Sequence, residues 1–201
     1  MERTATTERQ PVSLLTYGQE FLPVNDEYLP FKHAKWRELL HERMEVPFFV
    51  KSLRLPTCKR ILQVGCGSGM TLLPLAKLCQ PRRLVGIDID EQPLEQAQKR
   101  LMRHEVRAEL YQNDVRNLPF PDETFDIVLD FGTLYHINRR VKALREIRRV
   151  LINGGLFAYE TPFNQLLSHP VRSFGKRIPW RMAADLKPRR AGIMWSSRFK
   201  A

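Results

Sequence analysis

The sequence has no apolar run close to the roughly 18–20 residues that a bilayer-spanning helix needs. Its first ten residues, MERTATTERQ, lack the apolar core of a secretory signal peptide. Cysteine is scarce: Cys58, Cys66 and Cys79 show neither a paired framework nor C-x-x-C metal spacing. We therefore expect a cytoplasmic protein with reduced thiols and without a metal site.

Acidic residues are almost absent from the last forty positions. Residues 162–201 hold 9 Lys/Arg against one acid, Asp185, and so supply +8 of the formal net charge of +11. A solvated basic surface is the simplest interpretation of this segment. Contact with RNA phosphates or with an anionic membrane surface are the two alternatives.

The chain of 201 residues is long enough for one well-packed domain with added elements. Short apolar strands are expected at 60–64, 83–89, 108–114, 126–132 and 156–160. Helical segments are expected from Ser68, over 93–104 and over 141–151, the last ended by the glycines at 154–155. This alternation predicts an α/β fold, a doubly wound and mainly parallel sheet.

Flanking segments complete the predicted organisation. Residues 1–60 are expected to form an N-terminal helical cap, with one helix from Phe31 that Pro47 ends or kinks and a short helix before Pro56. Residues 61–161 form the predicted ligand-binding core. Residues 162–201 are expected to complete the sheet in an abbreviated form, with one terminal strand over 192–200.

A glycine-rich turn follows the first strand of this core, in the stretch ILQVGCGSGMT. In an open parallel sheet the ligand crevice lies at the carboxyl ends of the strands. Gly65, Gly67 and Gly69 fall there, and glycine lets a ligand approach the main chain closely. Taken alone, a structural tight turn would also explain the pattern.

Two acids strengthen the functional interpretation. Asp88 ends the second strand, 19 residues after Gly69, where a carboxylate suits two ribose hydroxyls and would repel a 2′-phosphate. Asp114 ends the third strand, where it could accept from an adenine amino group. Either acid might instead only cap the next helix or turn. NAD is disfavoured because Met70 interrupts the G-x-G-x-x-G pattern.

The chain resembles the class I S-adenosylmethionine-dependent methyltransferases, and in particular their small-molecule branch. The matching stretches are VGCGSG (64–69), GIDID (86–90), NDVRNLPFPDETFD (113–126) and LREIRRVLINGGLFAYETP (144–162). They cover about residues 60–162 in the order that the family has. The resemblance is specific for fold and cofactor and much less so for substrate.

The resemblance implies a site for S-adenosyl-L-methionine. The turn with Gly65, Cys66, Gly67 and Gly69 would cradle its methionine part, and Asp88 would hold the ribose. The residues implied at the adenine are Ile89, Asp114 and Val115, and those implied near the sulfonium are Asp130 and Phe131. Glu146 is shared with the family, but beside Arg145 and Arg149 it is expected to form a structural ion pair.

Gln63 departs from the family, which usually has Asp or Glu at this position to help bind the cofactor's ammonium. An amide oxygen still accepts a hydrogen bond, but without the charge-assisted contribution of roughly 1–2 kcal/mol. We expect weaker binding of the cofactor rather than none.

Methyl transfer needs alignment of the nucleophile, exclusion of water and sometimes a base. His136 and Tyr135 are the candidate bases after the fourth strand, and the alternative role for His136 is that of a helix-start or packing residue. Tyr17, Tyr28, His33 and Trp36 could form a lid, or Trp36 could simply pack on the sheet.

The sequence thus predicts an S-adenosylmethionine-dependent methyltransferase acting on a small molecule. An RNA methyltransferase that uses the basic segment, and a non-catalytic protein that binds the same cofactor, are the alternatives. The acceptor atom, the substrate and the oligomeric state do not follow from the sequence.

Overall fold

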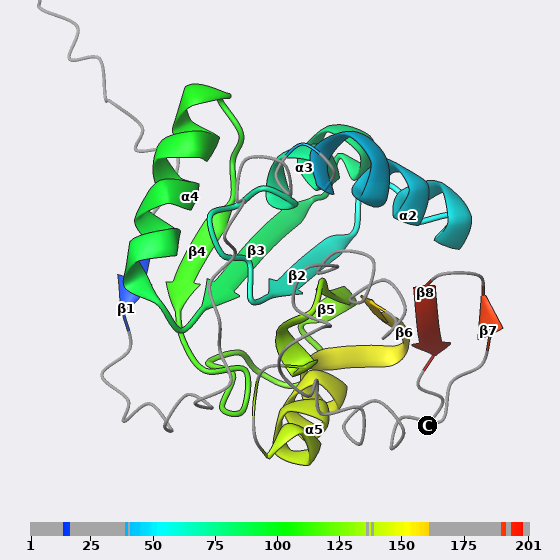
Figure 1. Ribbon diagram of the computed structural model, residues 1–201. Helices are drawn as coiled ribbons and strands as arrows, with labels where there is room; N and C mark the ends of the chain where they lie inside the picture. The colour runs from blue at the N-terminus through cyan, green and yellow to red at the C-terminus, as the bar shows by residue number, and fades with distance from the viewer. Residues whose placement is uncertain are drawn as a thin grey trace, which may run out of the picture.

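The computed structural model describes residues 14–16, 39, 41–135, 137, 139–160, 190–191 and 194–198. One eight-stranded sheet runs through these residues in the order β1-β4-β3-β2-β5-β6-β8-β7 (Figure 1). The strands are β1 (Leu14–Thr16), β2 (Arg60–Val64), β3 (Arg83–Asp88), β4 (Glu109–Gln112), β5 (Phe125–Asp130), β6 (Leu151–Glu160), β7 (Arg190–Ala191) and β8 (Met194–Arg198).

The centre of the sheet is parallel. Strands β1 to β6 pair in parallel wherever they are neighbours, and β8 pairs antiparallel with both β6 and β7. From β2 the chain first builds outward through β3 and β4, then returns to the other side of β2 as β5. The order therefore reverses between β2 and β5, the point at which open α/β sheets bind their ligands. The predicted doubly wound sheet is confirmed.

Helices cover the two faces of the sheet (Figure 1). The π-helical turn η1 (His41–Glu45), α2 (Val46–Leu53), α3 (Leu72–Cys79) and α4 (Glu91–Arg103) precede β4 in the chain, and the short η2 (Thr133–Tyr135) and α5 (Arg140–Val150) follow β5. Apolar side chains of α2, α3 and α4 form one buried cluster with one side of the strands. Those of α5 and of the loop after β4 form the second cluster. This three-layer arrangement buries both faces of the central strands.

The helix starts reflect local chemistry. The side chain of Asp90 accepts from the backbone N–H of Gln92 at 3.0 Å and so caps α4, while Pro93 lies in its first turn, as expected. Pro47 lies in the first turn of α2. The π-helical turn η1 ends at Glu45, directly before α2, so the change of helix type next to Pro47 agrees with the prediction that this proline ends or kinks the preceding helix.

The end of α5 also differs from the prediction. The helix ends at Val150, and the chain continues directly into β6 with Leu151 in an extended conformation. Between Phe125 and Ile127 the register on β6 jumps from Leu151 to Leu156. Gly154, with φ of 75°, thus belongs to an irregularity within β6 and not to a helix cap.

The C-terminal strands test the prediction that the sheet ends with one short strand. The expected strand over 192–200 is present as β8, but a second strand, β7, of two residues pairs with it. The edge is short, as expected, yet it holds two strands and not one. Among the helices that the structure describes, none is long and apolar enough to cross a membrane.

Candidate functional site

The glycine turn lies directly after β2, at the carboxyl edge of the sheet. Gly65, Gly67 and Gly69 all have positive φ, at 61°, 50° and 74°. L-residues rarely adopt this left-handed conformation, which costs them roughly 1–2 kcal/mol. The sequence prediction of a tight, glycine-dependent turn at this edge is confirmed.

The surroundings separate the roles of the three glycines. A Cβ on Gly65 would lie 1.7 Å from Oγ1 of Thr133, and one on Gly69 would lie 2.9 Å from Cβ of Ala97 on α4. Both positions are therefore closed by packing. A Cβ on Gly67 would meet no atom of the described residues within 4 Å, so with respect to these residues this glycine borders open space. Gly67 is the member of the turn that leaves room for a ligand.

Asp88 ends β3 and connects it to the turn. Its Oδ2 accepts from the backbone N–H of Gly67 at 2.7 Å, and its Oδ1 accepts from the N–H of Asp90 at 3.1 Å. Burial raises the pKa of Asp88, while these N–H groups act in the opposite direction. The N–H of Ile89 also acts on this carboxylate, so about one of its roughly four acceptor positions remains for a further donor.

Asp114 lies two residues beyond the end of β4, and its carboxylate already has a partner. Its Oδ1 accepts from the backbone N–H of Arg116 at 2.8 Å, and its Oδ2 accepts from Nη2 of Arg116 at 2.6 Å. Nε of Arg116 lies 2.9 Å and 3.0 Å from the two oxygens. Arg116 is 1% exposed and Asp114 7%. The sequence did not predict this buried ion pair.

The ends of β3 and β4 are joined by the main chain. The N–H of Asn113 donates to the carbonyl oxygen of Asp88 at 2.9 Å, which places Asp88 and Asp114 on neighbouring strand ends. Ile89 is half-buried beside them, and Val115 is buried in the second core cluster. The structure thus brings together the predicted ribose and adenine residues.

Asp130, the last residue of β5, organises the next turn. Its carboxylate accepts from the N–H groups of Gly132, Thr133 and Leu134 at 3.1, 2.6 and 3.2 Å. Burial raises the pKa of Asp130 to about 6 against the effect of these donors. The hydroxyl of Thr133 donates to the carbonyl oxygen of Val64 at 3.2 Å, which fastens η2 to the start of the glycine turn.

The candidate bases lie at the end of this turn. Tyr135 is the last residue of η2, and the position of its side chain is not described. His136 lies outside the described residues. Their proposed role as bases stays a prediction.

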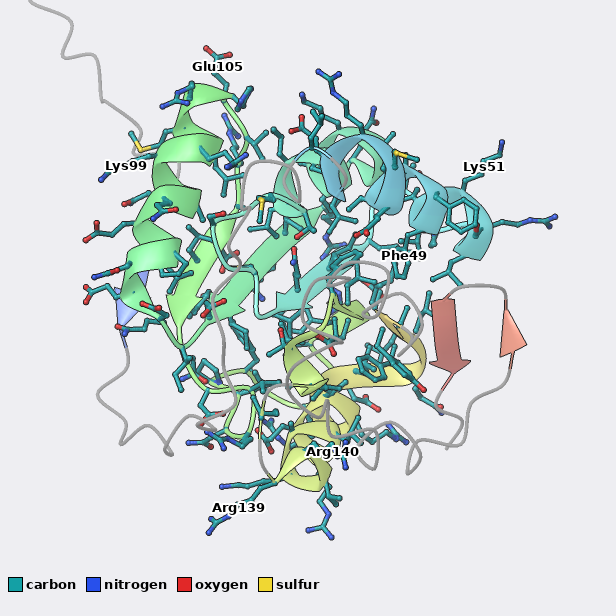
Figure 2. The ribbon with its side chains drawn as sticks, viewed as in Figure 1. Phe49, Lys51, Lys99, Glu105, Arg139 and Arg140 are labelled. Atoms are coloured by element: carbon teal, nitrogen blue, oxygen red, sulfur yellow. The ribbon has the colours of Figure 1, made fainter. Side chains whose placement is uncertain are left out.

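An aromatic pair borders the end of β5. The rings of Phe131 and Phe49 have centroids 5.1 Å apart at an interplanar angle of 56°. Figure 2 shows Phe49 on the side of α2 that faces the sheet, with Lys51 directed away from it. The N-terminal part of the chain therefore contributes Phe49 to this region. The predicted lid residues Tyr17, Tyr28, His33 and Trp36 lie outside the described residues.

Two buried polar atoms near the turn have no hydrogen-bond partner within the part of the chain that the structure describes. They are Oε1 of Gln63, whose residue is 1% exposed, and Oγ1 of Thr71, whose residue is 5% exposed. Gln63 lies on β2 two residues before Gly65, and Thr71 precedes α3 at its N-terminus. Burying such an oxygen without a donor costs about 1–3 kcal/mol, so each is suited to a ligand that supplies the missing partner.

Cys66, by contrast, faces the core. It is 4% exposed and belongs to the cluster under α2 and α3, and its Sγ would lie 2.9 Å from a Cβ on Gly86. Burial, with the nearby charge of Asp88 as a smaller cause, raises the pKa of this thiol well above its usual value. At this position any ligand contact falls to the backbone.

These residues fit the cofactor that the sequence suggests. Among the described residues, Oε1 of Gln63 has no donor and can accept from an ammonium, Gly67 has no atom within 4 Å of its Cβ position, and Asp88 can accept from a ribose hydroxyl. The acid at the end of β3 opposes a 2′-phosphate. Within the described part of the chain, no group of three or more His, Cys, Asp or Glu could hold a metal ion.

The loop beyond Arg116 is held by α5. Glu146 accepts from the N–H of Leu118 at 2.8 Å and pairs with Arg149 at 2.7 Å. Arg149 also donates to the carbonyl oxygens of Leu118 and Phe120 at 3.0 and 2.7 Å. The expected structural ion pair of Glu146 is confirmed with Arg149, and it fixes the segment that follows Asp114.

Sequence reasoning missed Arg116, Thr133 and Phe49. The two-residue spacing of Asp114 and Arg116, typical of an Asx-turn, could have suggested the first contact. Thr133 meets Val64 and Phe49 meets Phe131 across 69 and 82 positions of the chain, so no local pattern indicates either contact.

Comparison with known proteins supports this description. Residues 62–159 match the family described as a methyltransferase domain. A fatty-acid O-methyltransferase of Mycolicibacterium smegmatis is 36% identical over 102 residues, which are 50% of this chain and 36% of that protein. A probable phthiotriol/phenolphthiotriol dimycocerosates methyltransferase of Mycobacterium ulcerans is 35% identical over 101 residues, or 50% of this chain and 38% of that one.

The fold has solved counterparts. A putative S-adenosyl-L-methionine-dependent methyltransferase from Methanococcus maripaludis superposes with a TM-score of 0.60 at 20% identity, over 69% of this chain and 68% of its own. At this identity the likeness concerns the fold alone. The chain spans little more than a third of the length of the two curated relatives.

Proposed function

Because the chain belongs to the class I S-adenosylmethionine-dependent methyltransferases, we propose that it transfers a methyl group from S-adenosylmethionine to a small-molecule acceptor. The observation that carries the proposal is the buried Oε1 of Gln63 on the strand that leads into the glycine turn, which has no hydrogen-bond donor among the described residues. A ligand with an ammonium group would satisfy this oxygen.

Each part of the site has a proposed role toward the cofactor. Gln63 accepts from the ammonium, and the backbone from Gly65 to Gly69 surrounds the methionine part. Asp88 accepts from the ribose hydroxyls, while Ile89, Asp114 and Val115 contact the adenine. Asp130 and Phe131 line the methionine end. When bound, S-adenosylmethionine supplies an already activated methyl group.

The acceptor end is proposed from the aromatic pair and η2. Phe49 and Phe131 form an apolar wall that excludes water and favours an apolar acceptor. Tyr135, the last residue of η2, and His136, the next residue in the chain, are the candidates for removing a proton from the acceptor. Both curated relatives are named for lipid substrates, so fatty acids and lipid hydroxyls are the first acceptors to test.

The first experiment is calorimetric titration with S-adenosylmethionine, S-adenosylhomocysteine and NAD. We expect micromolar affinity for the two sulfur ligands and none for NAD. Absence of binding by both sulfur ligands would overturn the proposal. Transfer of a labelled methyl group to a panel of fatty acids and lipid alcohols then tests the acceptor class, because a protein that only binds the cofactor would label nothing.

Two glycine variants test the site within the same assay. Gly67→Ala adds a methyl group toward open space and strains φ by roughly 1–2 kcal/mol, so the fold should persist while affinity for S-adenosylhomocysteine falls about tenfold or more. Gly65→Ala forces its Cβ into Thr133, so the melting temperature itself should fall. Unchanged affinity in folded Gly67→Ala would show that the ligand does not approach this turn.

A further inference from the structure

Arg116 is the largest fully buried side chain among the described residues, and it pairs with an acid of the candidate site. A buried arginine is rare and costly unless its charge is paired. Here three N–H groups of one residue reach both oxygens of Asp114, at distances from 2.6 to 3.0 Å. The pair begins two residues after β4, at the strand end beside Asp88.

We propose that Arg116 is a positioning residue, which fixes the Asp114 carboxylate in the orientation that accepts a hydrogen bond from the adenine amino group of the cofactor. The inference rests on the proposed function, because it assumes that the cofactor is S-adenosylmethionine. Arg116 itself contacts Asp114 and acts through it.

The geometry explains how the orientation is fixed. A free aspartate rotates about two side-chain torsions, but the contacts from the backbone N–H and the guanidinium of Arg116 hold both oxygens at once. The three N–H groups make four contacts, two at each oxygen, because Nε is shared between the two oxygens. A carboxylate has about four acceptor positions, so we infer that the adenine N–H is accepted where the shared Nε gives up one of its two contacts, and the other contacts keep the pair intact.

The same arrangement predicts discrimination among bases. An ionised carboxylate is an acceptor only, so it pairs with the amino group of adenine and repels the carbonyl oxygen that hypoxanthine carries at the same position. Because Arg116 prevents the carboxylate from turning away, this repulsion cannot be relieved by rotation. A site built to bind one hydrogen-bonding group rejects the analogue that lacks it.

The test measures binding of S-adenosylhomocysteine and S-inosylhomocysteine by titration calorimetry. The wild-type protein should prefer the adenine ligand at least tenfold. Arg116→Lys keeps the charge but loses the fork of donors, so the preference should fall to about threefold or less. Arg83→Lys is the matched control, since Arg83 pairs with Glu109 at 2.7 Å at the amino end of β3. Its preference should match the wild type.

A purely structural role would weaken both ligands equally. An unchanged preference in folded Arg116→Lys, with lower affinity for both ligands, would therefore overturn the proposal. If Arg116→Lys does not fold, the neutral double variant Asp114→Asn with Arg116→Gln replaces it, and retention of the tenfold preference there would equally overturn it. Failure of the wild-type protein to bind S-adenosylhomocysteine would instead refute the proposed function.

Discussion

Gln63 shows how one side chain adjusts the site. Its buried oxygen has no donor, and a carboxylate there would add a charge-assisted bond to an ammonium. We expect Gln63→Glu to tighten binding of S-adenosylmethionine by roughly 1–2 kcal/mol, or about 5–30-fold. Titration calorimetry measures the change.

Methylthioadenosine is the matched control ligand for Gln63→Glu, because it has the nucleoside but no amino-acid part. Its affinity should not change. Equal effects on both ligands, or no effect on either, would mean that Gln63 does not meet the ammonium.

Asp130 introduces a pH dependence of stability. Burial raises its folded-state pKa to about 6 from 3.8, so the folded protein binds a proton more tightly than the unfolded chain does. The stability that this protonated group contributes is fully present below about pH 4 and is lost as pH rises through 6. Over that range the loss is at most about 3 kcal/mol.

The measurement is urea denaturation of the wild type and of Asp130→Asn at intervals from pH 4 to pH 8. The difference in unfolding free energy, wild type minus variant, should decrease between pH 4 and about 7 and then stay level. A difference independent of pH over that range would show that the folded-state pKa is not raised.

At the scale of elements, α2 packs on the sheet through its buried face. Phe49 is 1% exposed and contacts Phe131, whereas its neighbour Phe48 is 49% exposed. We expect Phe49→Ala to cost about 3–5 kcal/mol of unfolding free energy, because it removes a buried ring and leaves a cavity. Phe48→Ala should stay within about 0.5 kcal/mol of the wild type.

Denaturant midpoints of the two variants provide the comparison. Similar midpoints for Phe49→Ala and Phe48→Ala would mean that α2 does not pack on the sheet as described. A large loss for Phe49→Ala alone would confirm that α2 packs on the sheet through Phe49.

The loop between β4 and β5 is ordered by α5 rather than by regular structure of its own. Glu146 accepts from the backbone N–H of Leu118, and Arg149 donates to the carbonyl oxygens of Leu118 and Phe120. In a sheet, a neighbouring strand would supply these hydrogen bonds. Burial alone would raise the pKa of Glu146, but hydrogen bonds from Arg149 and from the backbone N–H of Leu118 outweigh it, so the pKa is lowered. The carboxylate thus stays ionised at neutral pH and keeps the segment after Asp114 in place.

At the scale of the whole molecule, the basic C-terminal segment contributes a strand to the sheet. Residues 194–198 pair with residues 156–160 of β6, so β8 covers an edge that would otherwise be open. Truncation after Glu160 should expose that edge and promote association between molecules. We expect a lower melting temperature and larger species in size-exclusion chromatography, and a monodisperse truncated protein of unchanged stability would contradict this role.

The charge of the segment is tested separately from its strand. Arg172, Lys176 and Arg177 lie outside the described residues and are not part of β8, so we expect their replacement by Gln to change the charge without removing this strand. Loss of salt-sensitive binding to RNA would favour the RNA alternative, and loss of binding to vesicles rich in anionic lipid would favour the membrane alternative. Unchanged binding in both assays would favour the interpretation of the segment as a solvated basic surface.

The sequence alone determined the alternation of strands and helices, the position of the glycine turn and the acid at the end of β3. These features depend on residues close together in the chain, where hydrophobic period and backbone freedom act locally. Asp88 and the turn were predictable for that reason.

Only the tertiary structure decided which of these residues contact other side chains and which lack a hydrogen-bond partner among the described residues. The closure of Gly65 by Thr133, the pairing of Phe49 with Phe131 and the missing partner of Gln63 depend on contacts between distant segments. The neighbours of a buried side chain come from packing in three dimensions, and neither periodicity nor spacing encodes them. Thus the sequence predicted where the candidate site lies, and the fold determined which of its described atoms have partners within the protein.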